Sequence, residues 1–201
     1  MGIIKLPHAT GSGSMSIGSP SDDPSGDLEL KLPSTVGSAG QVLSVDGSGN
    51  LVWTDNTPMW LVKVNTGSND QTIATATWTT VELTNEIFDT DNAFNTSNYT
   101  FTVPSGKGGK YWLYYHARIN GNPDDGENVQ ARLDKNGSAI HISYQTTFSA
   151  HNNQSTWIKN SWVEVLSAGD VLKMEIYHNE GGNATLDALA TFFGGYKLIG
   201  G

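Results

Sequence analysis

The sequence contains no cysteine, which excludes a disulfide framework and any thiolate metal site. This absence is typical of proteins that fold in a reducing compartment such as the cytoplasm. Basic residues are also scarce, because 11 lysines and arginines face 20 acidic residues and the net charge is −9. A surface that follows a nucleic-acid backbone needs clustered lysine and arginine. No such cluster occurs, so we expect no nucleic-acid partner.

Long apolar runs are missing as well. No run approaches the roughly 20 residues that cross a bilayer as a helix. Near the N-terminus, the apolar residues Ile3, Ile4 and Leu6 are interrupted by Pro7, and this run is too short for the core of a signal peptide. The sequence therefore predicts no membrane partner.

Aromatic residues are absent from the first 52 positions. Residues 1–50 contain 9 glycines, 10 serines and 4 prolines. Such a segment cannot bury enough apolar surface to offset the entropy lost on ordering. We therefore expect residues 1–36 to form an extended arm that binds a partner, with Ile3, Ile4 and Leu6 as its apolar anchors.

Residues 37–57 carry the pattern of a β-hairpin. Two β-prone runs flank a turn rich in glycine, aspartate and asparagine at residues 46–50. An isolated two-stranded hairpin is marginally stable in water, so its apolar side chains are expected to pack against another surface. These side chains are Leu43, Val45, Leu51 and Trp53.

From Pro58 onward, short β-prone runs alternate with turn residues, a pattern typical of a β-sandwich or barrel. No amphipathic helix and no internal repeat is visible. Strands are expected near residues 59–65, 72–74, 78–83, 98–103, 110–120, 128–135, 138–148, 157–166, 170–178 and 188–199.

The strand expected at residues 110–120 has bulky side chains on both faces. A strand with one face in water should alternate apolar and polar residues. We expect the face with Tyr111, Leu113 and Tyr115 to point into the core. The other face is expected to meet a neighbouring subunit or, as the alternative, another part of the same chain. It carries Trp112, Tyr114 and His116.

Five motifs follow one another between residues 71 and 198. They are QTIATATWTTVEL (71–83), EIFDTDNAF (86–94), YTFTVPSGKGGKYWLYYHARING (99–121), ARLDKNGSAI (131–140) and TFFGGYKL (191–198). In this order they resemble the globular C1q-like domain of the C1q/tumour-necrosis-factor superfamily. The resemblance implies that residues 58–201 form an all-β jelly-roll sandwich of about ten strands that assembles as a homotrimer. It also implies that the fold motif includes Trp78, Phe88, Phe94, Phe101, Tyr111 and Phe193.

The segment GSAGQVLSVDGSGNLVW (37–53) resembles a hairpin module that precedes the C-terminal domains of bacteriophage fibre and decoration proteins. Together the two resemblances imply a non-enzymatic virion protein. We expect a trimeric capsid decoration (cement) protein whose arms bind the major capsid protein. It would assemble in the host cytoplasm and lie on the outer capsid surface of the virion. The alternative is a short tail or head fibre whose tip binds a host-surface receptor or glycan.

The sequence offers few candidates for catalysis or metal binding. The five histidines show no spacing typical of a metal site. Asp124, Asp125 and Glu127 lie in one loop and are the candidate calcium ligands, although a solvated acidic loop is the simpler interpretation. A hydrolytic or metal-dependent tip enzyme is a third interpretation. The expectation is no cofactor and no catalytic residue.

Overall fold

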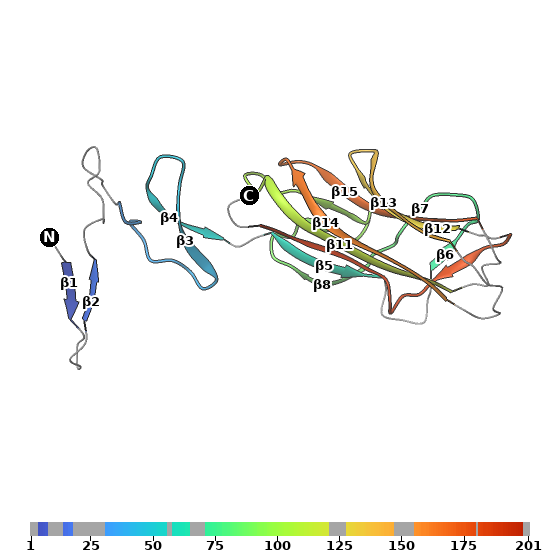
Figure 1. Ribbon diagram of the computed structural model, residues 1–201, viewed down its shortest axis with the longest axis horizontal. Coiled ribbons are helices and arrows are strands. Elements are labelled where there is room, and N and C mark those ends of the chain that lie inside the picture. The colour runs from blue at the N-terminus through green and yellow to red at the C-terminus, as the bar shows by residue number, and fades with distance from the viewer. Residues whose placement is uncertain are drawn as a thin grey trace. The chain divides into compact units, whose positions relative to one another are not determined.

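The computed structural model describes residues 4–7, 14–17, 31–55, 58–64, 71–120, 128–146, 155–179 and 181–198. Within these ranges the regular elements are β-strands, and none is a helix (Figure 1). The contacts divide the chain into two compact units, residues 1–54 and residues 55–201.

The first unit contains two short strand pairs. β1 (Ile4–Pro7) and β2 (Ser14–Ile17) are antiparallel, and their register places Ile4 opposite Ile17. No strand was expected in this arm. Apolar residues alternate with other residues in both segments, and this period of two is the pattern of a β-strand. Ile3 lies outside the described residues.

The second pair is the expected hairpin, formed by β3 (Gln41–Val45) and β4 (Leu51–Asp55). Its turn is fixed by Asp46, whose carboxylate accepts the backbone N–H groups of Ser48 and Asn50 at 2.8 and 2.9 Å. The indole N–H of Trp53 donates to the carbonyl of Thr35 at 3.0 Å. The segment before β3 therefore fixes the orientation of this ring.

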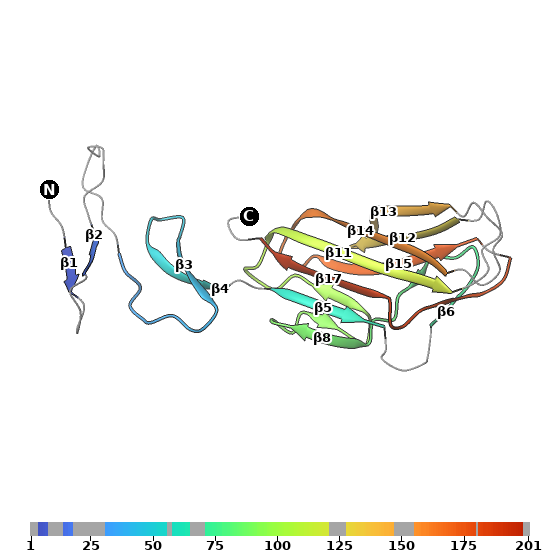
Figure 2. The same ribbon diagram turned by 60° about the horizontal axis from the view of Figure 1, so that its bottom comes forward.

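The second unit consists of two antiparallel sheets (Figure 2). The seven-stranded sheet has the order β6-β16-β11-β17-β5-β8, with β14 paired to β11. Its strands are β5 (Met59–Lys63), β6 (Gln71–Ile73), β8 (Asn85–Asp89), β11 (Gly109–Asn120), β14 (Ser155–Leu166), β16 (Ala184–Leu186) and β17 (Phe192–Lys197).

The six-stranded sheet has the order β13-β12-β15-β10-β9, with β7 paired to β15. Its strands are β7 (Thr79–Thr80), β9 (Phe94–Asn95), β10 (Thr100–Thr102), β12 (Asn128–Lys135), β13 (Ser138–Thr146) and β15 (Val171–His178).

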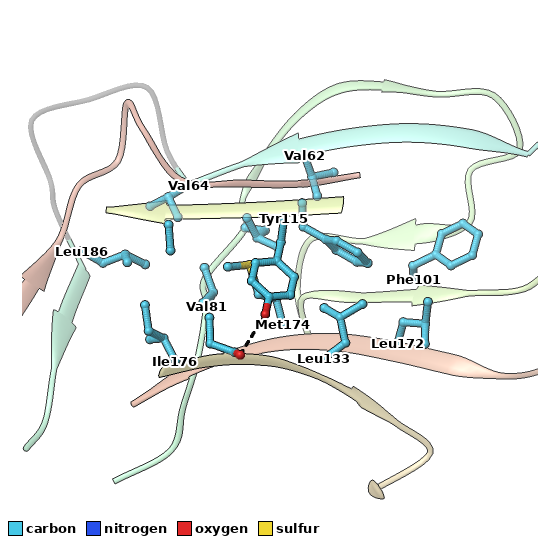
Figure 3. Packing of buried hydrophobic residues seen from close by; sticks show 14 of the residues in the cluster. Val62, Val64, Val81, Phe101, Tyr115, Leu133, Leu172, Met174, Ile176 and Leu186 are labelled. Carbon is cyan, nitrogen blue, oxygen red and sulfur yellow. Dashed lines mark hydrogen bonds between the residues drawn. The ribbon is translucent and has the colours of Figure 1, made fainter. Parts of the chain in front are cut away.

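The core lies between the two sheets, where side chains from both layers meet (Figure 3). β11 supplies one inner face, as expected, with Tyr111, Leu113 and Tyr115 buried. The ring of Trp60 on β5 stacks on Phe101 of β10 with centroids 3.6 Å apart. The hydroxyl of Tyr115 reaches across the core and donates to the carbonyl of Ala131 at 2.9 Å. Stacking and hydrogen bonding therefore join the two sheets.

Four of the six aromatic residues of the fold motif are buried in this core, namely Phe94, Phe101, Tyr111 and Phe193. The other two lie outside it, which corrects the expectation from the motif. Phe88 is 42% exposed, because β8 pairs with β5 so that Phe88 lies opposite Leu61 on the outer face. Trp78 lies on the outer face of the six-stranded sheet, where the Arg132 guanidinium stacks 4.0 Å from its ring centroid.

Most of the expected strands are present, but the sequence did not indicate three short ones, β8, β9 and β16. The last expected strand also begins later than predicted. Asp187 accepts the backbone N–H groups of Leu189 and Ala190 at 2.9 and 3.1 Å and so forms a turn. β17 therefore starts only at Phe192.

We expect Leu133→Ala to lower the free energy of unfolding by about 2–5 kcal/mol, because Leu133 is fully buried and its truncation leaves a cavity. Leu189→Ala is the matched control, since Leu189 is 75% exposed and the change should cost less than about 0.5 kcal/mol. Urea unfolding followed by tryptophan fluorescence measures both. Equal losses in the two variants would contradict this placement of the core.

Candidate interaction face

The outer face of the seven-stranded sheet is rich in apolar and aromatic side chains. The register places Trp112 between Val163 of β14 and Tyr196 of β17. Trp157 and Val165 at the β14 edge are 51% and 65% exposed. We call this surface the apolar face, and it comprises Met59, Leu61, Phe88, Trp112, Tyr114, His116, Trp157, Val163, Val165, Phe192 and Tyr196.

Four rings form a continuous aromatic row across β14, β11 and β17. His116 stacks on Phe192 with centroids 5.1 Å apart and lies 5.0 Å from Trp157. Tyr114 also meets Phe192, edge-on, with centroids 6.2 Å apart. The Nδ1–H of His116 donates to the carbonyl of Ala190, which fixes the imidazole ring. The row is therefore held in place within one chain.

A glycine in β17 lets Tyr114 lie flat across that strand. A Cβ atom at Gly194 would lie 2.6 Å from the Tyr114 hydroxyl, so no larger residue fits beneath the ring. Burial raises the pKa of Tyr114 above its ordinary value, and the neighbouring Tyr196 adds to this shift. The phenol is therefore neutral near pH 7 and packs as an apolar ring with a polar tip.

A shallow open hollow of about 400 Å³ lies beside Tyr114 at the β14 side of the face. Its polar groups come mainly from β14, and its other lining residues are aromatic. The lining residues are Tyr114, Tyr115, His116, Lys159, Asn160, Ser161 and Phe192. The hollow is suited to an apolar side chain that has a negative group next to it.

The apolar face carries no carboxylate at the outward positions of β5, β11, β14 and β17. The same positions hold Lys63, Lys110, Lys159 and Arg118. Arg118 pairs with Asp187, in the turn before β17, at 3.0 Å. In a chain of net charge −9, this sheet face is locally cationic.

The outer face of the six-stranded sheet has the opposite character. Arg132 and Lys173 form ion pairs with Glu175 at 2.7 and 2.9 Å. Burial alone would raise the pKa of Glu175, but the hydrogen bonds from Lys173 and Arg132 outweigh it and lower the pKa. Charges on this face are thus neutralised within the chain.

A third polar cluster joins the two sheets at the edge formed by β13 and β14. Glu164 accepts hydrogen bonds from Lys135 at 2.9 Å and from His141 at 2.6 Å. The His141 ring also lies 4.1 Å from the ring of Trp162. This cluster fastens β12 and β13 to β14.

The histidines that the structure describes do not converge. His116 lies on the apolar face and His141 at the sheet edge, while the Nε2–H of the buried His178 donates to the carbonyl of Ile73 at 2.9 Å. In the described part of the chain, no three histidine or acidic side chains are grouped to hold a metal ion. The candidate calcium ligands Asp124, Asp125 and Glu127 lie outside the described residues. No helix among the described residues could span a membrane.

The structure brings the three residues of the predicted subunit interface together. Trp112, Tyr114 and His116 all lie on the apolar face, on β11. Sequence reasoning missed its contributions from β5, β8, β14 and β17. The alternation of Trp157, Lys159, Ser161, Val163 and Val165 was a readable signal, because one face of this strand is largely apolar.

The other predicted binding residues lie in the first unit. On the hairpin, Leu43, Val45 and Trp53 keep substantial exposure, while Leu51 is half-buried. The anchor residues Ile4 and Leu6 lie in β1. The binding roles of both sets stay predictions.

Comparisons with known proteins give a likeness at the level of the fold. No family model matches the chain, and no curated protein sequence matches it. Among solved structures, the Eiger TNF of S. frugiperda is 13% identical, with 71% of this chain and 94% of that one covered and a TM-score of 0.51. The globular domain of zebrafish complement 1qA is 18% identical, with coverage of 71% and 98% and a TM-score of 0.49. Murine APRIL is 16% identical, with coverage of 70% and 99% and a TM-score of 0.49.

The two antiparallel sheets and the likeness to the Eiger structure confirm the predicted fold class. The second unit is a C1q/TNF-like jelly-roll β-sandwich. At these identities the comparison concerns the fold alone.

We expect the Glu164 cluster to make stability depend on pH. Burial alone would raise the pKa of Glu164, but the hydrogen bonds from His141 and Lys135 outweigh it and hold the pKa below its ordinary value. A carboxylate with a lowered folded-state pKa adds stability above its unfolded-state pKa and loses it as the pH falls through the folded-state value. Glu164→Gln should therefore lose less stability than the unmodified chain between about pH 5 and about pH 3. Urea unfolding at each pH measures this, and identical pH profiles would contradict the assignment.

Proposed function

We propose that the chain is a non-enzymatic structural protein of a bacteriophage virion, a homotrimeric capsid decoration (cement) protein. The apolar face joins the copies, and the N-terminal arms bind the major capsid protein on the outer surface of the particle. The fold is common to proteins of many functions, so the proposal depends on the surfaces of this chain.

The observation that carries the self-association is the exposed apolar face. Contiguous apolar patches on a folded domain mark sites of interaction. Tyrosine and tryptophan are favoured at interfaces, because each packs a large ring and keeps a polar tip. The face lies on one sheet only, while the other sheet presents paired charges. We infer that the apolar sheet is covered by further copies and that the charged sheet remains in water.

A non-enzymatic role is supported by the hollow on the apolar face. The ionisable groups that it presents are those of Lys159, His116 and Tyr114, because the hydroxyl of the lining residue Tyr115 points into the core. The Nδ1–H of His116 is engaged by a backbone carbonyl, and aromatic rings flank the imidazole on either side. This arrangement suits packing better than proton transfer.

Binding to a capsid is supported by the first unit. Thirty residues would reach at most about 100 Å if fully extended. Because β1 and β2 fold back on each other, the reach of the arm is shorter than this limit, and their pairing places the anchors Ile4 and Leu6 on one strand. Ordering such an arm costs entropy, but three arms in one trimer gain avidity. The hairpin adds the exposed apolar side chains of Leu43 and Val45 as a second contact.

One observation favours the second candidate, a fibre tip that binds a host glycan or receptor. On the charged sheet, Trp78 and Tyr177 form a half-buried ring pair 5.5 Å apart, and Arg132 stacks on Trp78. Rings beside fixed polar groups can contact both the apolar and the polar side of a ligand. Binding of the intact chain to a glycan array, lost in Trp78→Ala, would favour this candidate.

We expect the double substitution Trp112→Ser/Tyr114→Ser to dissociate the trimer, because it removes two rings from the middle of the apolar face. Light scattering coupled to size-exclusion chromatography measures the mass. Circular dichroism establishes that the variant retains its β-structure, which is expected because both side chains point away from the core.

The control is Tyr177→Ser on the charged sheet, which should remain trimeric. A fully trimeric and equally heat-stable Trp112→Ser/Tyr114→Ser variant would refute the interface. So would an unmodified chain that is monomeric at all accessible concentrations.

We expect deletion of residues 2–30 to abolish binding to capsids while the trimer persists. The arm holds the anchors Ile3, Ile4 and Leu6, whereas the apolar face belongs to the second unit. Co-sedimentation with capsids that lack this protein measures binding. A second variant, the full-length chain with Ile4→Ala and Leu6→Ala, tests the anchors themselves. It should bind capsids more weakly than the unmodified chain. Capsid binding by the deleted chain at its original strength would contradict the role of the arm.

A further inference from the structure

The two edges of the seven-stranded sheet carry opposite charges. Among the described strands, β14 pairs only with β11 and β8 pairs only with β5, so these strands form opposite edges of one sheet (Figure 2). A strand at a sheet edge is open to contact with another chain. The side chains at the two edges therefore decide which edge another copy can approach.

The β14 edge is cationic and partly apolar. Lys159 is exposed, and it forms no ion pair with any residue that the structure describes. It borders the hollow next to Ser161 and the rings of His116 and Phe192. The strand exposes Trp157 on one side of Lys159. A negative side chain with an apolar neighbour would complement this surface.

The β8 edge has the matching features. Glu86 is exposed and has no ion-pair partner among the described residues. The register between β5 and β8 shifts at this point, so Ile87 is the extra residue of a bulge and is 49% exposed. A bulge redirects a side chain away from the regular alternation. Phe88 completes an acidic and apolar edge.

We propose that copies of this chain associate head to tail, with the β8 edge of one copy on the β14 edge of the next. Glu86 pairs with Lys159 of the neighbouring copy, and Ile87 fills that copy's hollow. This inference rests on the proposed self-association and names the residues that give it direction. The site on β14 is incomplete without the second copy.

Charge favours this arrangement over a symmetric one. Two β14 edges facing each other would bring the Lys159 side chains of both copies together without a carboxylate on that face. A β14 edge against a β8 edge brings opposite charges together. A contact between two different patches is heterologous, and it forms a closed ring when the rotation between copies closes. In a trimer, three such rotations close the ring.

The test is a charge exchange read by sedimentation equilibrium at low salt. Lys159→Glu and Glu86→Lys should each raise the protein concentration at half-assembly by at least about tenfold, because like charges then meet at every interface. The double variant Lys159→Glu/Glu86→Lys should restore assembly. The matched control is Lys159→Glu/Glu82→Lys, which has the same net charge and should stay dissociated.

Substitutions that remove the two charges provide a second test. Lys159→Gln and Glu86→Gln should each weaken assembly, and the two together should weaken it no more than one alone. If the charge-exchange variant stays dissociated, or if single reversals leave assembly unchanged, the edge pairing is wrong while the trimer stands. If the unmodified chain does not assemble, both this inference and the proposed self-association are wrong.

Discussion

The packing of the second unit depends on two consecutive glycines in β17. Successive residues of a strand point to opposite faces, so Gly194 opens the outer face and Gly195 the inner one. A Cβ at Gly194 would collide with Tyr114, and a Cβ at Gly195 would lie 2.6 Å from the ring of Trp60. One aromatic ring therefore crosses the strand on each side. Gly195 thus leaves room for Trp60 in the core, and Gly194 leaves room for Tyr114 at the centre of the apolar face.

This arrangement explains how one sandwich carries two different outer surfaces. On the six-stranded sheet, the ion pairs among Arg132, Lys173 and Glu175 satisfy one another and leave a hydrated face. On the seven-stranded sheet, the space above Gly194 is taken by Tyr114, and the neighbouring outward positions are apolar or cationic. An acidic chain thus keeps carboxylates off the outward positions of β5, β11, β14 and β17. Because the β14 edge is cationic and the β8 edge acidic, the two edges of this sheet differ, and association through them has a direction.

The sequence predicted the sandwich and the strand at its centre because period-two patterns are local. Tyr111, Leu113 and Tyr115 are buried as their spacing indicated. Phe88 could not be placed, because its position depends on pairing with β5 and on the bulge at Ile87, which involve residues distant in the chain. The same holds for β9 and β16, whose two- and three-residue strands are too short to show a period.

The part of the interaction face that the sequence identified lies on a single strand. Trp112, Tyr114 and His116 alternate within β11 and were therefore recognisable together. The contributions of Trp157 and Phe192 depend on which strands flank β11, and this is a property of the topology. The opposite charges of Lys159 and Glu86 became meaningful only once β14 and β8 were seen to be the two edges of one sheet.

The two proposed binding surfaces differ in their thermodynamics. The core is buried within one chain, and the rings of the apolar face are already held by His116, Phe192 and Gly194. Association through a preformed face costs little ordering entropy. The glycine- and serine-rich composition of the arm predicts that binding carries a cost in ordering entropy, so we expect each arm alone to bind weakly for its contact area. In the proposed trimer, the rigid faces keep three such arms together, and the effective concentration they share converts weak contacts into firm attachment.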